Sequence, residues 1–325
     1  MSVTSKEVAK RAHVSASTVS RAFSRPDKVE AGTRARILEV AKELGYQPNK
    51  AASLLSLGKT GCIGALIPDL NNPFFAGVLK GISEETSRMN MQLFVNDFSD
   101  DRGFEAQQAN TLSQLTDGLI LCSSRLTDDE IRQLNTVIPV VLLNRRLKGI
   151  PYVHFDNAGG IRQAVLHLSA LGHTRIGYCA GPGLSRSASE RMRAFLQTTD
   201  EVLSGTAMVL GEFESTFAGG NEAADEALNA GVTAVIAYND VMAIGMMHRL
   251  LSYEIDLPEK LSIVGIDNIP VSEMVTPSLT TVQLPQAEAG AKVTQLLHSS
   301  IEGKPLEGVE MASSLVVRQS TTRAL

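Results

Sequence analysis

The sequence predicts an α/β protein: a small all-helical N-terminal domain followed by a large body of two lobes, each built on a parallel β-sheet. Three short helical patterns occupy the first 45 residues. After Gly61, short apolar strands alternate with helical stretches of ~10–18 residues, which is typical of parallel βαβ units. The alternation recurs before and after about residue 155, and one open sheet seldom exceeds ~10 strands, so we expect two lobes.

The N-terminal helices are predicted from caps and apolar spacing. Thr4 and Glu7 form a capping-box pattern, and Ser15 is expected to cap a second helix, ASTVSRAF, after a turn at His13. Gly45 is expected to end the third helix. The predicted apolar sides consist of Val8, Ala9, Ala12, Val19, Phe23, Ile37, Leu38, Ala41 and Leu44. Two helices joined by a tight turn and braced by a third describe a helix-turn-helix.

The second of these helices carries residues suited to reading DNA. In a helix-turn-helix its N-terminal residues meet base edges in the major groove, here the methyl of Ala16 and the hydroxyl of Ser17. Arg21, one turn further on, suits the bidentate contact with guanine. The residues expected to hold phosphates are Thr4, Ser15, Thr18 and Ser20. From spacing alone, a three-helix protein-interaction module with a solvated Ser/Thr face remains an alternative.

Charge is distributed unevenly along the chain. Residues 1–60 hold 11 Lys and Arg against 5 Asp and Glu, whereas the rest holds 19 against 30. A basic head on an acidic body indicates that only the N-terminal domain contacts a polyanion.

Eight strands are predicted in the body: residues 62–68, 92–97, 117–122, 139–144, 175–181, 233–238, 261–267 and 280–284. Ligands of such sheets bind beyond the carboxyl ends of the strands. Polar and aromatic residues follow four of these strands, in the segments Asp69–Phe75, Asn144-Arg145, Asn239-Asp240 and Asp267-Asn268. Aromatic faces with Asn, Asp and Arg groups are the chemistry that holds neutral sugars. Any one of these Asn or Asp residues alone could instead cap a helix, and Asp240 is expected to do so.

Other classes of protein lack their motifs. The chain has no GxGxxG after the first strand, no GxxxxGK[ST], no GxSxG and no HExxH, so we predict no catalytic residue and no cofactor. His173 is expected to be structural. Cys62, Cys122 and Cys179 form no metal-binding pattern and are expected to be buried thiols. With no signal peptide and no apolar run of membrane-spanning length, we expect a cytoplasmic protein without a membrane partner.

The segment TSKEVAKRAHVSASTVSRAF…TRARILEVAKELGYQPNKAASLL closely resembles the headpiece of the LacI/GalR family of bacterial repressors. Two departures are His13, where the family usually has glycine, and Glu30, which replaces a usual serine cap. Asn49–Leu57 resembles the family's hinge, which orders on operator DNA and enters the minor groove. The resemblance implies that Asn49 and Ala52 contact DNA and that Leu55 wedges between base pairs to kink it.

The body resembles the same family and the periplasmic pentose- and hexose-binding proteins, in NNPFF, HLSALGHTRIGYCAGP, YNDVMAIGMM, LPEKLSIVGIDN and PSLTTV. The resemblance implies a type I periplasmic-binding-protein-like body. It also implies a ribose-type pocket formed by Asn72, Phe74, Phe75, Asn144, Arg145, Arg191, Phe213, Asn239 and Asp267. Asn144 stands where ribose binders have aspartate, and Leu284 stands at the position of a pocket glutamine. Whether Gln283 or Leu284 faces the pocket is left open.

From these comparisons we expect a helix-turn-helix headpiece at 1–48, a hinge helix and linker at 49–60, and an effector-binding and dimerisation domain at 61–325. Lobe one is expected to comprise about 61–155 and 284–312, and lobe two about 156–283 and 313–325. The chain ends without the leucine-heptad tail that makes tetramers in the lactose repressor, so a homodimer is expected. The helix face with Met242, Met246 and Met247 is a candidate interface, with core packing as the alternative.

The resemblance implies a repressor of carbohydrate-utilisation genes. A homodimer would bind a palindromic, double-stranded DNA operator and be released by a small effector, a neutral monosaccharide such as a pentose. An alternative is a co-repressor-type regulator that senses a purine or a sugar phosphate. A sugar-binding transport protein and a doubly wound enzyme are weaker alternatives, since the first would need export and the second lacks its motifs.

Overall fold

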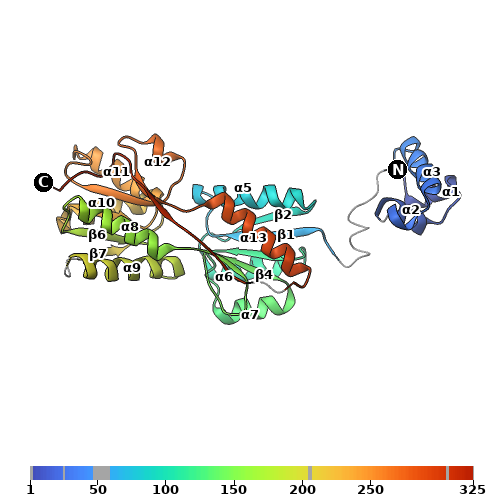
Figure 1. Cartoon of the computed structure of the whole chain (residues 1–325), viewed down its shortest axis with the longest axis horizontal. Coiled ribbons are helices and arrows are strands. Elements are labelled where there is room, and N and C mark those ends of the chain that lie inside the picture. The colour runs from blue at the N-terminus through green and yellow to red at the C-terminus, as the bar shows by residue number, and fades with distance from the viewer. Residues whose placement is uncertain (1–2, 25, 47–58, 204–206, 305–306, 325) are drawn as a thin grey trace. The chain divides into compact units, whose positions relative to one another are not determined.

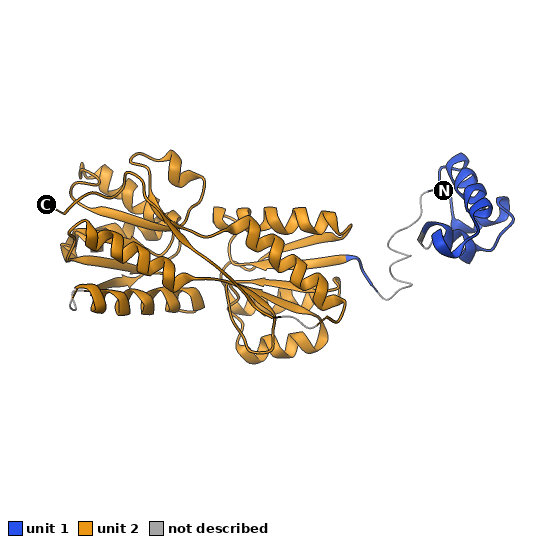
Figure 2. Ribbon diagram, viewed as in Figure 1, with its two compact units in different colours: residues 1–61 blue, residues 62–325 orange. Residues whose placement is uncertain are grey.

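In a computed structural model the chain divides into two compact units, residues 1–61 and 62–325 (Figure 2). The structure describes residues 3–24, 26–46, 59–203, 207–304 and 307–324. The predicted hinge residues Asn49, Ala52 and Leu55 lie outside these ranges.

The N-terminal unit is a three-helix bundle around a small apolar core. It consists of α1 (Ser5–Arg11), α2 (Ala16–Ser24), a 3₁₀ turn (Pro26–Lys28) and α3 (Ala31–Glu43). The core residues are Val8, Ala9, Ala12, Val19, Ala22, Ile37 and Ala41. The prediction of three helices in a helix-turn-helix arrangement is therefore confirmed.

Both departures from the family pattern have a structural account. His13, in the turn between α1 and α2, adopts the left-handed conformation with φ 54°. This conformation is free of strain for glycine and uncommon for other residues, although Asn, Asp and His adopt it more often than the rest. The Glu30 side chain caps α3 because its carboxylate accepts from the backbone N–H groups of Gly32 at 3.1 Å and Thr33 at 3.0 Å. The Glu30 carboxylate thus caps the helix in place of the usual serine hydroxyl.

The body contains two six-stranded sheets, in agreement with the predicted two-lobed α/β architecture (Figure 1). The first sheet has the all-parallel order β11-β5-β4-β3-β1-β2, and the second has the order β12-β10-β9-β8-β6-β7, in which β12 is antiparallel to β10. The strands are β1 (Cys62–Ile67), β2 (Gln92–Asp97), β3 (Leu119–Cys122), β4 (Val140–Leu143), β5 (Tyr152–Phe155), β6 (Ile176–Ala180), β7 (Ala207–Glu212), β8 (Ala234–Ala237), β9 (Ser262–Asp267), β10 (Thr280–Gln283), β11 (Val309–Met311) and β12 (Ser314–Val316).

Helices cover both faces of each sheet. Lobe one, built on β1–β5 and β11, has α5 and α13 on one face and α6 and α7 on the other. Lobe two, built on the other sheet, has α8 and α9 on one face and α10 and α11 on the other. The helices are α5 (Pro73–Arg88), α6 (Arg102–Ser113), α7 (Asp128–Val137), α8 (Asn157–Ala170), α9 (Arg186–Leu203), α10 (Phe217–Ala230), α11 (Asp240–Ser252), α12 (Val271–Met274) and α13 (Gln286–Ile301). Among the described residues, no helix is long and apolar enough to cross a membrane.

Several expectations for single residues are decided by burial. Met242, Met246 and Met247 are buried in the core of lobe two, so the interface proposed for this face is wrong and core packing is right. His173 is structural, because its ring nitrogens contact Thr233 Oγ1 at 2.9 Å and the Thr322 carbonyl at 3.0 Å. The three cysteines are free thiols; Cys122 and Cys179 are buried and Cys62 is half-buried.

Candidate functional sites

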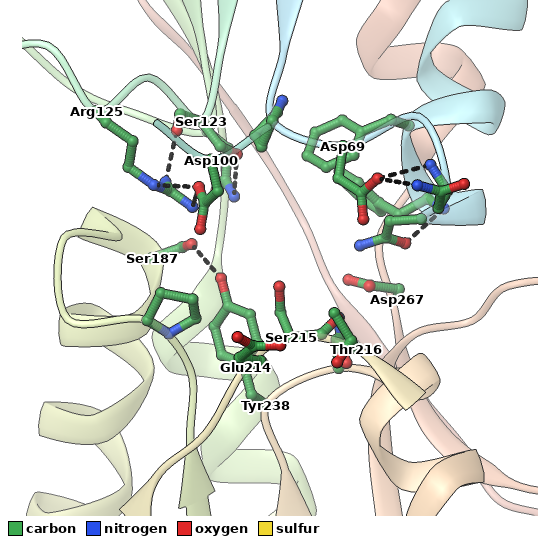
Figure 3. A pocket seen from close by; sticks show the side chains of 18 of the residues that line it. Asp69, Asp100, Ser123, Arg125, Ser187, Glu214, Ser215, Thr216, Tyr238 and Asp267 are labelled. Carbon is green, nitrogen blue, oxygen red and sulfur yellow. Dashed lines mark hydrogen bonds and ion pairs between the residues drawn. The ribbon is translucent and has the colours of Figure 1, made fainter. Parts of the chain in front are cut away.

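A cavity of about 360 Å³ lies between the two lobes, at the carboxyl ends of their strands (Figure 3). Lobe one contributes the segments that follow β1, β2, β3 and β4. Lobe two contributes the segments that follow β6, β7, β8 and β9. The lining residues are Pro68, Asp69, Asn71, Asn72, Phe74, Phe75, Asp97, Ser99, Asp100, Ser123, Arg125, Asn144, Pro182, Ser187, Arg191, Glu214, Ser215, Thr216, Tyr238, Asn239 and Asp267.

The structure brings most of the predicted pocket residues together. Those that line the cavity are Asn72, Phe74, Phe75, Asn144, Arg191, Asn239 and Asp267. Arg145, Phe213 and both candidates of the pair Gln283 and Leu284 do not line it. Gln283 is exposed at the end of β10, whereas Leu284 is buried in the core.

Arg145 is a correction, because its side chain is buried away from the cavity. Its guanidinium donates to the carbonyl of Ser124 at 3.0 Å and that of Leu126 at 2.5 Å, and to the Asp128 carboxylate at 2.6 Å. Arg145 therefore holds the loop between β3 and α7. Asn144, its neighbour with φ 59°, is the residue of the pair that lines the cavity.

Phe213 is also a correction. Its ring packs against Gly211 and the apolar core beneath α10 and α11. The three residues after it, Glu214, Ser215 and Thr216, line the cavity instead. The prediction therefore identified the correct segment of the chain but the wrong residue within it.

Two asparagines both cap helices and line the cavity. Asn72 Oδ1 accepts from the Phe74 N–H at 3.0 Å, and Asn239 Oδ1 accepts from the Met242 N–H at 2.8 Å. Capping and ligand contact are therefore compatible at these positions. The expectation that Asp240 caps α11 is wrong, since Asn239 is the cap.

Asp240 instead anchors the loops beneath the cavity. Its fully buried carboxylate accepts from the Ile269 N–H at 3.0 Å, the Ser272 hydroxyl at 2.6 Å and the Thr281 hydroxyl at 2.5 Å. Burial raises the pKa of this carboxyl, and the hydrogen bonds from Ser272 and Thr281 oppose the rise.

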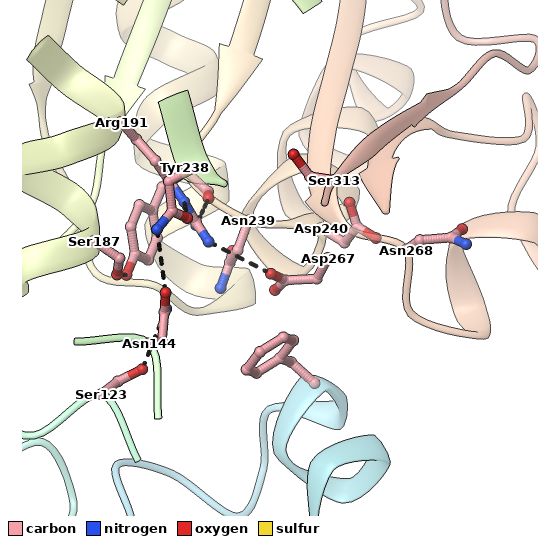
Figure 4. A network of polar contacts seen from close by, with 12 residues as sticks. Ser123, Asn144, Ser187, Arg191, Tyr238, Asn239, Asp240, Asp267, Asn268 and Ser313 are labelled. Atoms are coloured by element: carbon pink, nitrogen blue, oxygen red, sulfur yellow. Dashed lines mark hydrogen bonds and ion pairs between the residues drawn. The ribbon is translucent and has the colours of Figure 1, made fainter. Parts of the chain in front are cut away.

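Arg191 and Asp267 form the polar centre of the lobe-two wall (Figure 4). Arg191 is 3% exposed; it donates to the Tyr238 carbonyl at 2.7 Å, and its guanidinium lies 5.0 Å from the centre of the Tyr238 ring. The Asp267 carboxylate lies 3.9 Å from the guanidinium and makes no hydrogen bond with a described side chain or backbone N–H. Burial raises its pKa well above the usual value; Arg191 opposes this rise and Asp240 adds to it. A donor group and a buried acceptor thus face the cavity side by side.

Lobe one faces this pair with an aromatic wall and a polar one. Phe74 and Phe75, at the start of α5, are buried and meet edge to face with ring centres 5.1 Å apart. On the other side, the Asn144 amide faces the cavity beside Ser123 (Figure 4). An apolar face opposite a donor–acceptor pair is the arrangement in which proteins hold a sugar ring.

The cavity is acidic. Among its described lining residues, the carboxylates of Asp69, Asp97, Asp100, Glu214 and Asp267 outnumber the guanidinium groups of Arg125 and Arg191 by five to two. Arg125 is already paired, because its Nε donates to Asp100 at 2.7 Å and its Nη1 to the Ser123 carbonyl at 2.6 Å. The field in the cavity therefore favours neutral or cationic groups over anions.

Several residues that line this cavity have strained backbone conformations. Ser99, Asp100, Ser123, Asn144 and Asp267 all have positive φ, between 46° and 120°, and all line the cavity. Such conformations cost of order 1–3 kcal/mol each and persist where the surrounding structure imposes them. Because five of these residues line one cavity, we infer that the fold accepts a loss of stability in order to position the side chains of the cavity.

Sequence reasoning missed several lining residues, although a signal existed for some. Asp97 is the last residue of the predicted strand β2, Ser99 and Asp100 follow it, and Ser123 and Arg125 follow the predicted strand β3. The rule that ligands bind beyond strand ends would have found them. The lining residues Glu214, Ser215 and Thr216 follow β7, a strand that was not predicted.

In the N-terminal unit, α2 presents its polar residues on an exposed face. Ser17, Ser20 and Arg21 are exposed, and Arg21 Nε donates to the Ser17 carbonyl at 3.2 Å. Ser15 accepts from the Thr18 N–H at 3.2 Å as the N-terminal cap. Ala16 is half-buried and packs against the core, so its methyl is only partly presented. Thr4, at the N-terminus of α1, donates its backbone N–H to Glu7 at 2.7 Å.

A helix-turn-helix unit joined to a two-lobed body with a polar cavity defines a class, the DNA-binding regulators with a ligand-sensing domain. Comparison with known proteins agrees with this class. Residues 4–49 match the model of the bacterial regulatory proteins of the lacI family, and residues 165–321 match that of the periplasmic binding protein-like domain.

The full chain has relatives of the same kind. The ribose operon repressor of Halalkalibacterium halodurans is 34% identical over 322 residues, which are 98% of this chain and 97% of the relative. The lac repressor dimer bound to operator and the anti-inducer ONPF superimposes with a TM-score of 0.88 at 26% identity, over 99% of this chain and 100% of that one. A LacI family regulator from Enterococcus faecium with bound ribose gives a TM-score of 0.73 at 27% identity, over 80% and 98% of the two chains. This protein belongs to the LacI family of bacterial transcriptional regulators.

Proposed function

We propose that this regulator represses carbohydrate-utilisation genes as a cytoplasmic homodimer on a palindromic operator, and that a neutral monosaccharide in the interlobe cavity releases it. The observation that carries the effector proposal is the Arg191–Asp267 pair, in which a buried donor group and a carboxylate free of hydrogen bonds from the described chain face the same space. Adjacent sugar hydroxyls can each accept from one partner and donate to the other.

The charge of the cavity favours a neutral sugar over a phosphate. A phosphate ester would enter among five acidic side chains, and the two guanidinium groups of the lining leave only one nitrogen, Arg191 Nη2, that donates no hydrogen bond to the described chain. Arg125 is paired with Asp100, and Arg191 is directed to Tyr238 and Asn157. Like charges in a site of this kind oppose binding, and the opposition grows as water is excluded. The same argument disfavours an effector of the purine nucleotide type.

The relatives support the same choice. The relative of highest identity named above is a ribose operon repressor, and the regulator from Enterococcus faecium carries ribose. Asn72, Phe74, Arg191, Asn239 and Asp267 line the cavity here. We therefore propose a pentose or a similar polyol as the first class of effector to test.

The DNA-binding part of the proposal follows from α2 and from two-fold symmetry. Ser17 and Arg21 are exposed on the second helix of the helix-turn-helix, where they would read base edges in the major groove. A homodimer carries two such helices related by a two-fold axis, which calls for a palindromic site.

The effector proposal is tested by a thermal-shift screen of the full-length protein against pentoses, hexoses, polyols, nucleosides and their phosphates. A ligand at ~100 times its Kd adds about 2.7 kcal/mol of stability to the state that binds it. We expect neutral sugars to raise the Tm of the wild type and of Arg162→Ala, which removes a surface ion pair with Glu201, but not that of Arg191→Ala. Shifts confined to phosphates or purines would refute a neutral sugar as the effector, and equal shifts with Arg191→Ala would refute the site.

A further inference from the structure

We propose that Asn157 is a positioning residue of the effector cavity and the centre of a clasp that joins the two lobes; the proposal rests on the cavity being the effector site. Asn157, the first residue of α8, is 3% exposed and does not line the cavity. Its side chain nevertheless contacts two residues that do. Asn157 Oδ1 accepts from Arg191 Nε at 3.0 Å, and Asn157 Nδ2 donates to Asn144 Oδ1 at 3.1 Å.

The orientation of the Asn157 amide is determined by its partners. Arg191 can only donate, so it must face Oδ1. Asn157 Nδ2 also donates to Glu190 Oε2 at 3.1 Å. Burial tends to raise the pKa of Glu190, but its hydrogen bond and attraction to His154 and the hydrogen bond from Asn157 outweigh it, so the pKa is lowered. Glu190 is therefore an ionised acceptor, and rotating the amide by half a turn would break three favourable contacts.

The clasp crosses between the lobes at two points. Asn144 follows β4 in lobe one, whereas Asn157 and Glu190 belong to α8 and α9 in lobe two. His154, on β5 of lobe one, is 1% exposed, and its Nε2 lies 2.9 Å from Glu190. The Asn157–Asn144 and His154–Glu190 contacts therefore both join one lobe to the other in this structure.

Within lobe one, the clasp continues from His154 through further polar contacts. His154 Nδ1 lies 3.2 Å from Glu310 Oε2, on β11. Arg146 donates to both carboxylate oxygens of Glu310, at 2.7 and 2.8 Å. A continuous polar chain thus runs from Arg191 in the cavity, through Asn157 and Glu190, to the outer strands of lobe one. On this proposal the polar chain positions Arg191 and, at the same time, stabilises the relative setting of the lobes found in this structure.

The first test uses Asn157→Leu, which keeps the size of the side chain and removes its polar atoms. Arginine-selective ¹⁵N NMR reports the hydrogen exchange of Arg191 Nε–H, which should quicken by about tenfold or more when its buried acceptor is lost. Spin labels at Val137→Cys in lobe one and Leu228→Cys in lobe two, both exposed in the wild type, with Cys62 replaced by Ser, report the interlobe distance. We expect its distribution to broaden.

A matched control and a rescue separate positioning from general loss of stability. Asn135→Leu removes an asparagine that accepts from the Val140 N–H at 3.0 Å within lobe one, and it should leave both readouts unchanged. Asn157→Asp alone sets two carboxylates against each other and should broaden the distribution. Adding Glu190→Gln to Asn157→Asp exchanges donor and acceptor across the same contact. This double variant should restore the narrow distribution, while Arg191 Nε–H exchanges slowly in both aspartate variants because a carboxylate oxygen still accepts from it.

Wild-type exchange and distances in Asn157→Leu would overturn the proposal. So would a double variant that folds, as judged by circular dichroism, but does not regain the narrow distance distribution. Should Asn157→Leu fail to fold, the single and double aspartate variants still decide the question. Neither readout needs a ligand, so the absence of any sugar binding would count against the proposed effector and not against the clasp.

Discussion

Replacing Asp267 by asparagine should stabilise the body while weakening its ligand affinity. The carboxylate is 4% exposed, accepts no hydrogen bond from a described donor, and has its nearest cation, Arg191, 3.9 Å away. Its pKa is raised well above the usual value because burial outweighs the attraction of Arg191, and Asp240 adds repulsion. In the folded protein the ionised form is therefore disfavoured relative to the neutral form, which asparagine imitates in shape and charge.

The magnitude follows from the cost of carrying a negative charge at a buried position, because asparagine keeps the shape and the polar atoms of the side chain and removes only the charge. Removing this cost should raise the free energy of unfolding of Asp267→Asn by about 1–3 kcal/mol near neutral pH. In a body of this size each kcal/mol corresponds to roughly 2–4 °C in Tm. Above the folded pKa, where the carboxylate is ionised, effector binding should fall by about 10- to 150-fold, because a hydrogen bond to a charged group contributes ~1.5–3 kcal/mol.

The gain should depend on pH. The folded pKa of Asp267 lies above the usual value of 3.8, so the wild type loses stability as the pH rises from about 4 through the folded pKa. Asp267→Asn lacks this loss. The stability difference between the two proteins should be smallest in acid and largest above the folded pKa.

Denaturant unfolding of both proteins between pH 4 and 8, with calorimetry of the sugar found in the screen, measures these effects. Asp225→Asn is the matched control: the pKa of Asp225 is lowered chiefly by the hydrogen bond from Arg249, so this substitution should not stabilise. A destabilised Asp267→Asn at neutral pH, or a stability difference that does not change with pH, would refute the reasoning.

Three predictions concern the N-terminal unit. Arg21→Ala should weaken binding to the selected operator by about 5- to 150-fold, from the ~1–3 kcal/mol of a bidentate guanine contact, but should hardly change binding to random DNA; equal losses in anisotropy titrations would argue against base reading. Glu30→Ala should lower the Tm of the N-terminal transition of the full chain, because it removes the cap of α3, and Glu30→Ser should restore that Tm. An unchanged Tm in Glu30→Ala would contradict the capping role. His13→Gly should stabilise the same transition by up to about 1 kcal/mol, since glycine adopts φ 54° without strain, and a loss of stability would contradict this.

Most of the fold could be predicted because its strands are buried apolar runs with clear ends. All eight predicted strands are present, and β1, β3, β4, β6, β8 and β9 are almost entirely buried. The strands that were not among the eight predicted ones are β5, β7, β11 and β12. β11 and β12 have three residues each, and β7 lies at a sheet edge with half-exposed, mixed residues. β5 is as long as β3 and β4, but His154 interrupts its apolar run. Short or half-solvated strands carry too weak a period to be distinguished from loops.

The candidate site was predictable to the level of segments but less so to the level of side chains. Which residue of Asn144-Arg145 faces the cavity depends on the positive φ of Asn144, and alternation along a strand does not continue through such a residue. Asn157 and His154 were not predicted at all. Their roles come from partners 13 to 156 residues away in the chain, and no local pattern encodes such contacts.

We propose that a neutral sugar in the interlobe cavity releases this regulator from DNA. Its most direct test is fluorescence anisotropy of the full-length protein on a palindromic duplex selected from a random pool, titrated with the sugar identified by thermal shift. We predict release of the wild type and retention of Arg191→Ala on the same duplex at every sugar concentration. A wild-type complex that the sugar leaves unchanged or tightens, or an Arg191→Ala complex released at wild-type concentrations, would contradict the account.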